Sequence, residues 1–225
     1  MASALPSEFF PRDIAFHLAN VSRSGGVATN GQERVVASDA GRWKARLIQC
    51  PVYTNDQILA FRAFLFGMQG RAGTCLVPVF GEDRRANWPR DELGRVVSPE
   101  TARRNRLDGT QFADPAVPAQ TQISARLRTA APRRATTLQI ELLQGSPIRP
   151  GQYFSFNGRL HVITAALGGE AYAIRPPLRE AAGQGWFLNL SAPVCEMRLA
   201  SDDSGELELQ LGRWGFVDLE FVEAF

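Results

Sequence analysis

Apolar and polar residues alternate with a period of two in several separate stretches, and this pattern limits the possible folds more than any other feature. In residues 42–47, Trp43, Ala45 and Leu47 alternate with basic side chains. A strand with this period has one buried face and one wet face. The same alternation recurs in residues 14–19, 138–142, 207–211 and 217–221. The sequence therefore predicts a mainly β protein.

Turn residues divide these strands. Asn157-Gly158 lies between Tyr153–Phe156 and residues 159–163, and Asn-Gly favours the type I′ turn of a two-residue hairpin. Gly168-Gly169 is typical of a further hairpin turn, and residues 22–26 are predicted to form a turn or loop tip. A hairpin over Gly212–Gly215 would join the last two strands. Pro176-Pro177 should end a strand, with residues 178–182 as one helical turn.

One helix is expected, over about residues 55–69. Thr54 and Gln57 have the spacing of a capping box, in which each side chain binds the other's backbone N–H. Behind them Ile58, Phe61, Leu65 and Met68 recur at helical spacing, and a glycine in the segment Gly67–Gly70 should supply a left-handed cap. Residues 74–80 then form a short strand, which Pro78 assigns to a sheet edge.

Residues 81–122 differ from the rest of the chain. They are rich in arginine and proline and show no sustained period. A stretch of this length exceeds ordinary loops, so it is either functional or a linker. Trp88, Leu93 and Val96 lie within it, and such groups favour docking on this subunit or a neighbour. We interpret it as an extended connector or arm.

The order of elements suggests two domains. Residues 1–80 would form one β domain with the helix, and about 205–225 return to its sheet, since chain termini often lie close together. Residues 123–204 would form an inserted small β-barrel. A fragment of residues 1–122 should then be insoluble or molten.

No stretch carries a catalytic, cofactor-binding or metal-ligating motif, so no such residue, cofactor or metal is assigned. His17 and His161 both fall in strand patterns and are interpreted as exposed. Cys50, Cys75 and Cys195 are widely spaced, which favours free, buried packing thiols in a reducing compartment. A nucleophilic pair of Cys50 or Cys75 with His17 stays open as a lesser alternative. The expectation is that the protein is not an enzyme.

Composition excludes other classes. The chain has 25 basic and 23 acidic residues, a net charge of +2, so the whole molecule does not attract nucleic acid strongly. Lys44 is the only lysine; a GC-rich coding genome explains this, and arginine also suits interfaces. No secretory signal and no apolar run of ~18 residues is present, so a cytoplasmic origin without a membrane segment is expected.

Two binding functions remain as alternatives. Aromatic residues interleaved with arginine in residues 153–159 could stack single-stranded nucleic acid on an OB-like barrel. However, Phe154 and Phe156 share a strand face, as core packing requires. Carbohydrate binding would depend on Trp186 and Trp214.

Several short motifs resemble those of the distal tail proteins of siphophages. They are Arg42-Trp43-x-Ala45-x-Leu47, the helix segment Leu59–Leu65, Gly70-Arg71-Ala72-Gly73, Leu142–Gly145, residues 150–154 with the Asn157-Gly158 hairpin, and Pro176-Pro177-Leu178-Arg179. Together they span most of the chain except residues 81–122, where it departs from the family.

The resemblance implies that the first domain is a tail-tube-like β-sandwich and that the small barrel is OB-like or galectin-like. It also implies a structural virion protein of the tail tip or baseplate, assembled in the host cytoplasm. Such proteins form an adaptor ring, usually a hexamer, that joins the tail-tube protein to the hub, tail fibre or tape-measure protein. DNA would meet this protein only by passing through the ring. Residues 22–41 and 81–122 are our candidates for arms that order on assembly.

Overall fold

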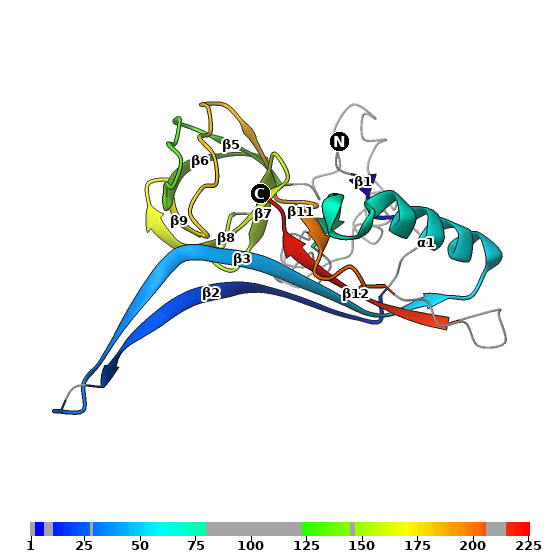
Figure 1. Ribbon diagram of the computed structural model, residues 1–225. Coiled ribbons are helices and arrows are strands. Elements are labelled where there is room, and N and C mark those ends of the chain that lie inside the picture. Colours follow the sequence, from blue (N-terminus) through cyan, green and yellow to red (C-terminus); the bar gives the residue numbers. More distant parts are fainter. Residues whose placement is uncertain (1–2, 7–10, 28, 80–122, 145–146, 206–214) are drawn as a thin grey trace, which may run out of the picture. The chain divides into compact units, whose positions relative to one another are not determined.

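The computed structural model describes residues 3–6, 11–27, 29–79, 123–144, 147–205 and 215–225. The chain is mainly β with one α-helix and forms two compact units (Figure 1). Residues 1–77 and 195–225 make up the open-sheet unit, and residues 78–194 make up the barrel unit. The predictions for residues 81–122 and 207–211 and most of the Gly212–Gly215 hairpin lie outside the described residues.

The open-sheet unit contains one six-stranded sheet in the order β1-β4-β11-β12-β3-β2. These strands are β1 (Ser3–Ala4), β2 (Asp13–Val27), β3 (Glu33–Val52), β4 (Cys75–Pro78), β11 (Val194–Leu199) and β12 (Gly215–Glu223). The sheet edges are therefore β1 and β2. Because β4 lies between β1 and β11, the prediction that Pro78 marks an edge strand is wrong, although β1 covers only two residues of β4.

The helix α1 (Asn55–Met68) covers one face of this sheet (Figure 1). Its capping box is confirmed: the Gln57 N–H donates to the Thr54 hydroxyl at 3.2 Å, and the Gln57 side chain accepts from the Thr54 N–H. The buried helix residues are Ile58, Phe61, Phe64 and Met68. Leu65, expected in that set, is only partly buried.

The C-terminal cap of α1 differs from the prediction. Gln69, not a glycine, is the capping residue and has a φ of 50°, and its N–H binds the Phe66 carbonyl. Gly70 also has a positive φ and starts the short 3₁₀ helix η1 (Gly70–Ala72). The Arg71 N–H donates to the Asp202 carboxylate at 2.9 Å. This contact with the turn after β11 is tertiary, so the local sequence does not reveal it.

The strand β12 lies inside the sheet, paired antiparallel with β3 and with β11. Its buried side chains Val217, Leu219 and Phe221 follow the predicted period of two. The structure moves the end of the barrel from residue 204 to about residue 194, because β11 pairs with β12 in the open sheet. The alternation of β11, in which Cys195, Met197 and Leu199 are buried, cannot identify the sheet that receives it.

The barrel unit contains a closed barrel in the order β10-β5-β6-β9-β8-β7. Its strands are β5 (Ser124–Leu127), β6 (Thr137–Gln144), β7 (Tyr153–Phe156), β8 (Arg159–Gly168), β9 (Ala171–Arg175) and β10 (Phe187–Asn189). The short strand β10 closes the barrel, since it pairs with both β5 and β7. The centre is filled by apolar side chains such as Leu138, Ile140, Phe154 and Ile163.

Both predicted barrel hairpins are confirmed. Asn157 and Gly158 have φ values of 48° and 73°, as a type I′ turn requires, and Phe156 pairs with Arg159 across it. Gly168 and Gly169 have φ values of 89° and 57° at the β8–β9 turn. Residues 178–182 are not helical: they are tied to residues 131–135 by backbone hydrogen bonds, which override the local preference.

The predicted turn at residues 22–26 is also wrong. The strand β2 continues to Val27 and pairs with β3 as far as Glu33. The register shifts between Ser24 and Val27, so the two glycines are accommodated as an irregularity within a ribbon. The described turn residues 29–32 instead contain Asn30, whose side chain accepts from the Gln32 N–H at 3.1 Å.

Candidate interaction surfaces

The three cysteines do not form a reactive site. Cys50, Cys75 and Cys195 are free and buried, as predicted. Burial, assisted by Asp218, raises the pKa of Cys50 to about 11, and burial, assisted by Glu196, raises the pKa of Cys75 to about 12. A thiol is nucleophilic as its thiolate, so these two groups are poorly suited to attack at neutral pH.

The two histidines lie in different environments. His17 is exposed, whereas His161 is fully buried, so the prediction of two exposed histidines is wrong for His161. The His161 ring stacks with the rings of Phe154 and Phe156, with centroid distances of 5.4 and 5.9 Å. His161 pairs with Phe154 across the hairpin, so it lies on the same face as the phenylalanine and is buried with it.

The polar atoms of His161 show that it is a neutral packing residue. Nδ1 lies 2.9 Å from the Pro176 carbonyl, so it carries the proton and donates. Nε2 has no partner among the described residues. Burial, followed by the charges of Arg179 and Arg159, lowers the pKa of His161 to about 4, although the hydrogen bond to Pro176 acts in the opposite direction. Within the described part of the chain, no three His, Cys, Asp or Glu side chains are grouped to hold a metal ion.

The first candidate surface is a two-stranded ribbon, which we define as residues 21–27 of β2 and 33–38 of β3. From Ala19 and Arg42 toward the tip, β2 and β3 pair with each other. The strand β12 does not reach this part, because it pairs with β3 only over residues 44–52. Val21, Val27, Val35 and Val36 are exposed on the ribbon, Val36 by 69%. An isolated two-stranded ribbon is marginally stable in water, so these side chains are suited to a partner surface.

The second candidate surface is an apolar stripe on the outer side of α1, formed by Leu59, Ala63 and Phe66. Their spacing places them on one helix face, away from the buried residues of the same helix. Phe66 is 80% exposed. The sequence-based predictions concern the buried face of this helix and miss the stripe, although the same helical spacing could have revealed it.

A groove of about 570 Å³ adjoins the stripe, which we call the α1 groove. It lies between the C-terminal half of α1 and the turn at residues 201–205. Its apolar lining comes from Phe61, Leu65, Phe66 and Leu199, and its polar lining includes Arg62, Gln69, Asp202 and Asp203. Only the tertiary structure brings α1 beside this turn, so the sequence could not predict the groove.

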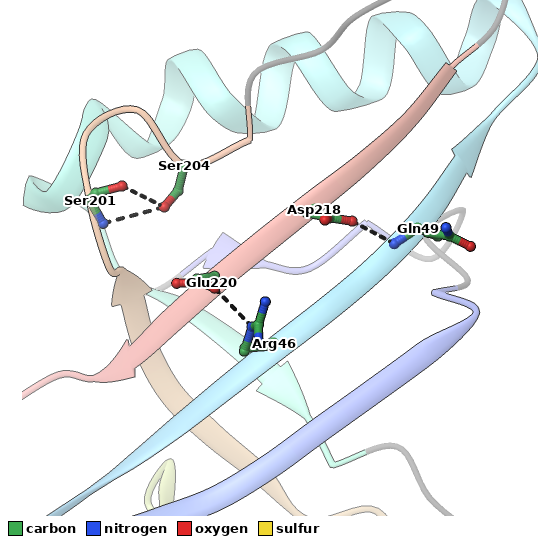
Figure 2. A network of polar contacts seen from close by, with 6 residues as sticks. All are labelled: Arg46, Gln49, Ser201, Ser204, Asp218 and Glu220. Atoms are coloured by element: carbon green, nitrogen blue, oxygen red, sulfur yellow. Dashed lines mark hydrogen bonds and ion pairs between the residues drawn. The ribbon is translucent and has the colours of Figure 1, made fainter.

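The face of the sheet opposite the apolar core is polar. Arg46 and Glu220 pair across β3 and β12 at 2.8 Å, and both side chains are about half exposed (Figure 2). On the same two strands the Asp218 carboxylate accepts from the Gln49 N–H at 2.7 Å, where the β12 register shifts (Figure 2). Ser201 and Ser204 bind each other within the turn after β11. These contacts tie the sheet together and leave its face wet.

The barrel unit offers a smaller apolar surface. Phe187 is 67% exposed, and Trp186 beside it is partly exposed while its ring contacts Phe156 at 5.9 Å. The nearby arginines are already engaged: Arg126 pairs with Glu141 at 2.8 Å, and Arg128 pairs with Glu170 at 2.7 Å. Hydrogen bonding to Glu141 raises the pKa of Arg126, and hydrogen bonding to Arg126 lowers the pKa of Glu141.

The sequence matches no protein-family model and no curated protein. Among the residues that the structure describes, no helix is long and apolar enough to cross a membrane. Trp214, the second tryptophan considered for sugar stacking, lies outside those residues.

Proposed function

We propose that this chain is a structural subunit of a bacteriophage tail tip, a distal tail protein that assembles into an adaptor ring. The ring, with six copies as the resemblance implies, would join the tail-tube protein to the hub and host-recognition apparatus. In this proposal the open-sheet unit corresponds to the tail-tube-like domain, and neighbouring subunits complete its layers. The protein would act by assembly and would carry no catalytic residue.

The observation that carries the proposal is the ribbon of β2 and β3. It extends past the last residue of β3 that pairs with β12. Its valine side chains are exposed, and the outer edge of β2 has no strand partner among the described residues. Monomeric proteins usually shorten, charge or cover such an edge, because it invites pairing with other chains. A long edge strand with few charged side chains is typical of a strand that a partner covers. Head-to-tail contacts of this kind close into rings when the rotation allows it.

The buried side chains give independent support for a structural role. The cysteines and His161, the residues most suited to chemistry, are buried in packing positions. In contrast, the exposed apolar groups gather on the ribbon and on α1. Among the described residues, the unusual feature is therefore the exposed apolar surface and not a cluster of accessible reactive groups.

The test is the mass and location of the protein. The purified full-length chain, alone and with the tail-tube protein, should give a ring by light scattering and negative-stain electron microscopy. Antibody labelling should place it at the tail tip of virions. A monomer at every concentration, with or without the tube protein, or its absence from virions, would contradict the proposal.

A second function, carbohydrate binding by the barrel unit, has one favourable observation. Trp186 and Phe187 expose aromatic surface side by side in sequence, as sugar stacking requires. Single-strand nucleic-acid binding has less support, since Phe154 and Phe156 are buried and Arg126 and Arg128 are ion-paired. A glycan array with the full chain and its Trp186→Ala variant would test the sugar function: binding lost in the variant supports it.

A further inference from the structure

The ribbon and the α1 groove have complementary surfaces. One face of the ribbon exposes Val21 and Val36 together with two cations, Arg23 and Arg34, because Arg23 pairs with Val36 and side chains of a strand alternate between faces. The groove has the opposite character at its rim, where Asp202 and Asp203 are exposed carboxylates. Apolar groups can thus meet apolar groups while arginines meet carboxylates, and such matching fixes orientation in an interface.

The groove has room for part of the ribbon. Its volume of about 570 Å³ falls within the ~300–1,000 Å³ typical of cavities that hold drug-sized ligands. Ala63 and Gly67 are small and exposed beside Phe66, so the backbone of a partner strand can approach the helix closely. A Cβ added to Gly67 would meet nothing within 4 Å.

The two surfaces of one copy do not meet. Within the open-sheet unit, Figure 1 shows the free end of the ribbon at one end and α1 at the other. The ribbon residues pair only between β2 and β3 in the described register. A contact between ribbon and groove therefore requires two molecules, and because it joins different surfaces it is head-to-tail.

We infer that the ribbon of one copy docks in the α1 groove of a second copy. Val21 and Val36 would cover the stripe of Leu59, Ala63 and Phe66, with the ribbon arginines of the same face at the carboxylate rim. The inference rests on the proposed self-assembly and specifies the contact that holds neighbouring subunits together. It also accounts for exposed apolar groups on two separate parts of the same unit.

Disulfide trapping tests the contact directly. Full-length chains carrying Val36→Cys and Phe66→Cys are purified separately, mixed and mildly oxidised. The native cysteines are buried and should not compete. A disulfide between the two variants, identified by mass spectrometry, is expected, since bridged residues need Cα atoms within ~7 Å. The matched control replaces Val36→Cys with Lys44→Cys, an exposed residue on the polar face of the same strand. No mixed disulfide, or equal yield with the control, would overturn the inference.

A mass measurement provides the second readout. Phe66→Glu should weaken self-association by about tenfold or more, as expected for an exposed aromatic anchor in an interface. Phe187→Glu changes a phenylalanine of the barrel unit that is 67% exposed and should leave assembly unchanged. Folding should survive both substitutions, because both side chains lie mostly in solvent. Equal assembly of the wild type and Phe66→Glu would overturn the inference.

Three further outcomes distinguish the possible occupants of the groove and separate this inference from the proposed function. A disulfide within one chain carrying Phe66→Cys and Leu209→Cys would place the chain's own residues 206–214 in the groove and would overturn the docking. If the two cysteine variants assemble into rings that enter tails but form no mixed disulfide, this contact is rejected and the proposed function stands. A mixed disulfide in a protein absent from virions would support the contact and reject the proposed function.

Discussion

Within the part of the chain that the structure describes, the two units differ in their strand edges: the barrel is closed and has none, whereas the open sheet has two. In the barrel unit β10 pairs with both β5 and β7, so each strand of the barrel has two neighbours. In the open-sheet unit β2 has no strand on its outer edge among the described residues, and it continues into the ribbon. Closure removes edges, whereas an open sheet retains a surface for pairing. The barrel thus closes on itself, whereas the open sheet leaves the edge that the proposed assembly would use.

Fragments give the largest expected effect. Residues 123–194 contain every strand of the barrel and should fold alone, with cooperative thermal unfolding by circular dichroism. Residues 1–122 lack β11 and β12, which lie between β4 and β3, and should be insoluble or molten. A cooperative unfolding transition in fragment 1–122, or none in fragment 123–194, would break the comparison.

Core substitutions in each unit should have the next largest effect on stability. Phe154→Ala in the barrel and Phe221→Ala in the open sheet each remove a fully buried ring, at a cost of about 3–5 kcal/mol. If the units unfold separately, scanning calorimetry should show two transitions, and each variant should lower only that of its own unit. A single transition lowered equally by both variants would show that the units unfold together.

The buried His161 should make barrel stability depend on pH. Its pKa is about 4 in the folded barrel and near 6.5 when unfolded, so between these values the unfolded state binds more protons. Stability should be constant above pH 6.5 and fall as the pH drops from 6.5 to 4, by up to about 3 kcal/mol. Urea unfolding of fragment 123–194 across this range measures it.

The control for this pH effect is His161→Asn. The asparagine amide can still donate to the Pro176 carbonyl but does not titrate. The variant should be less stable at pH 7 because the ring packing against Phe154 is lost, yet its stability should change less between pH 6.5 and 4. The same slope in both proteins would assign the pH dependence to other groups.

Surface ion pairs should have the smallest effect, and a similar one in both units. Glu220→Gln removes the partner of Arg46 on the open sheet, and Glu141→Gln removes the partner of Arg126 on the barrel. Exposed pairs contribute little because water screens them. Neither variant should measurably shift its unit's thermal midpoint. A clear loss for Glu220→Gln alone would mean that the open sheet depends on its polar face more than the barrel does.

The sequence by itself determined the features that neighbouring residues control. Thr54 and Gln57 are three residues apart, so the capping box needs no tertiary help. Asn157-Gly158 adopts the positive φ angles that these residue types favour. The alternation in β3 and β12 fixed which side chains are buried, because the period of a strand is a property of the backbone.

The tertiary structure alone decided where those elements lie and what surrounds them. Alternation does not name a strand's partner, so β11 was assigned to the barrel and pairs in the open sheet. It also gives no measure of how deeply a face is buried, so His161 was expected in solvent, whereas it is buried opposite Phe154 and stacks with two phenylalanine rings. The α1 groove depends on the turn after β11 reaching the helix, a contact between residues more than 130 positions apart in the case of Arg71 and Asp202. Local preferences act over a few residues, whereas burial and pairing depend on the whole chain.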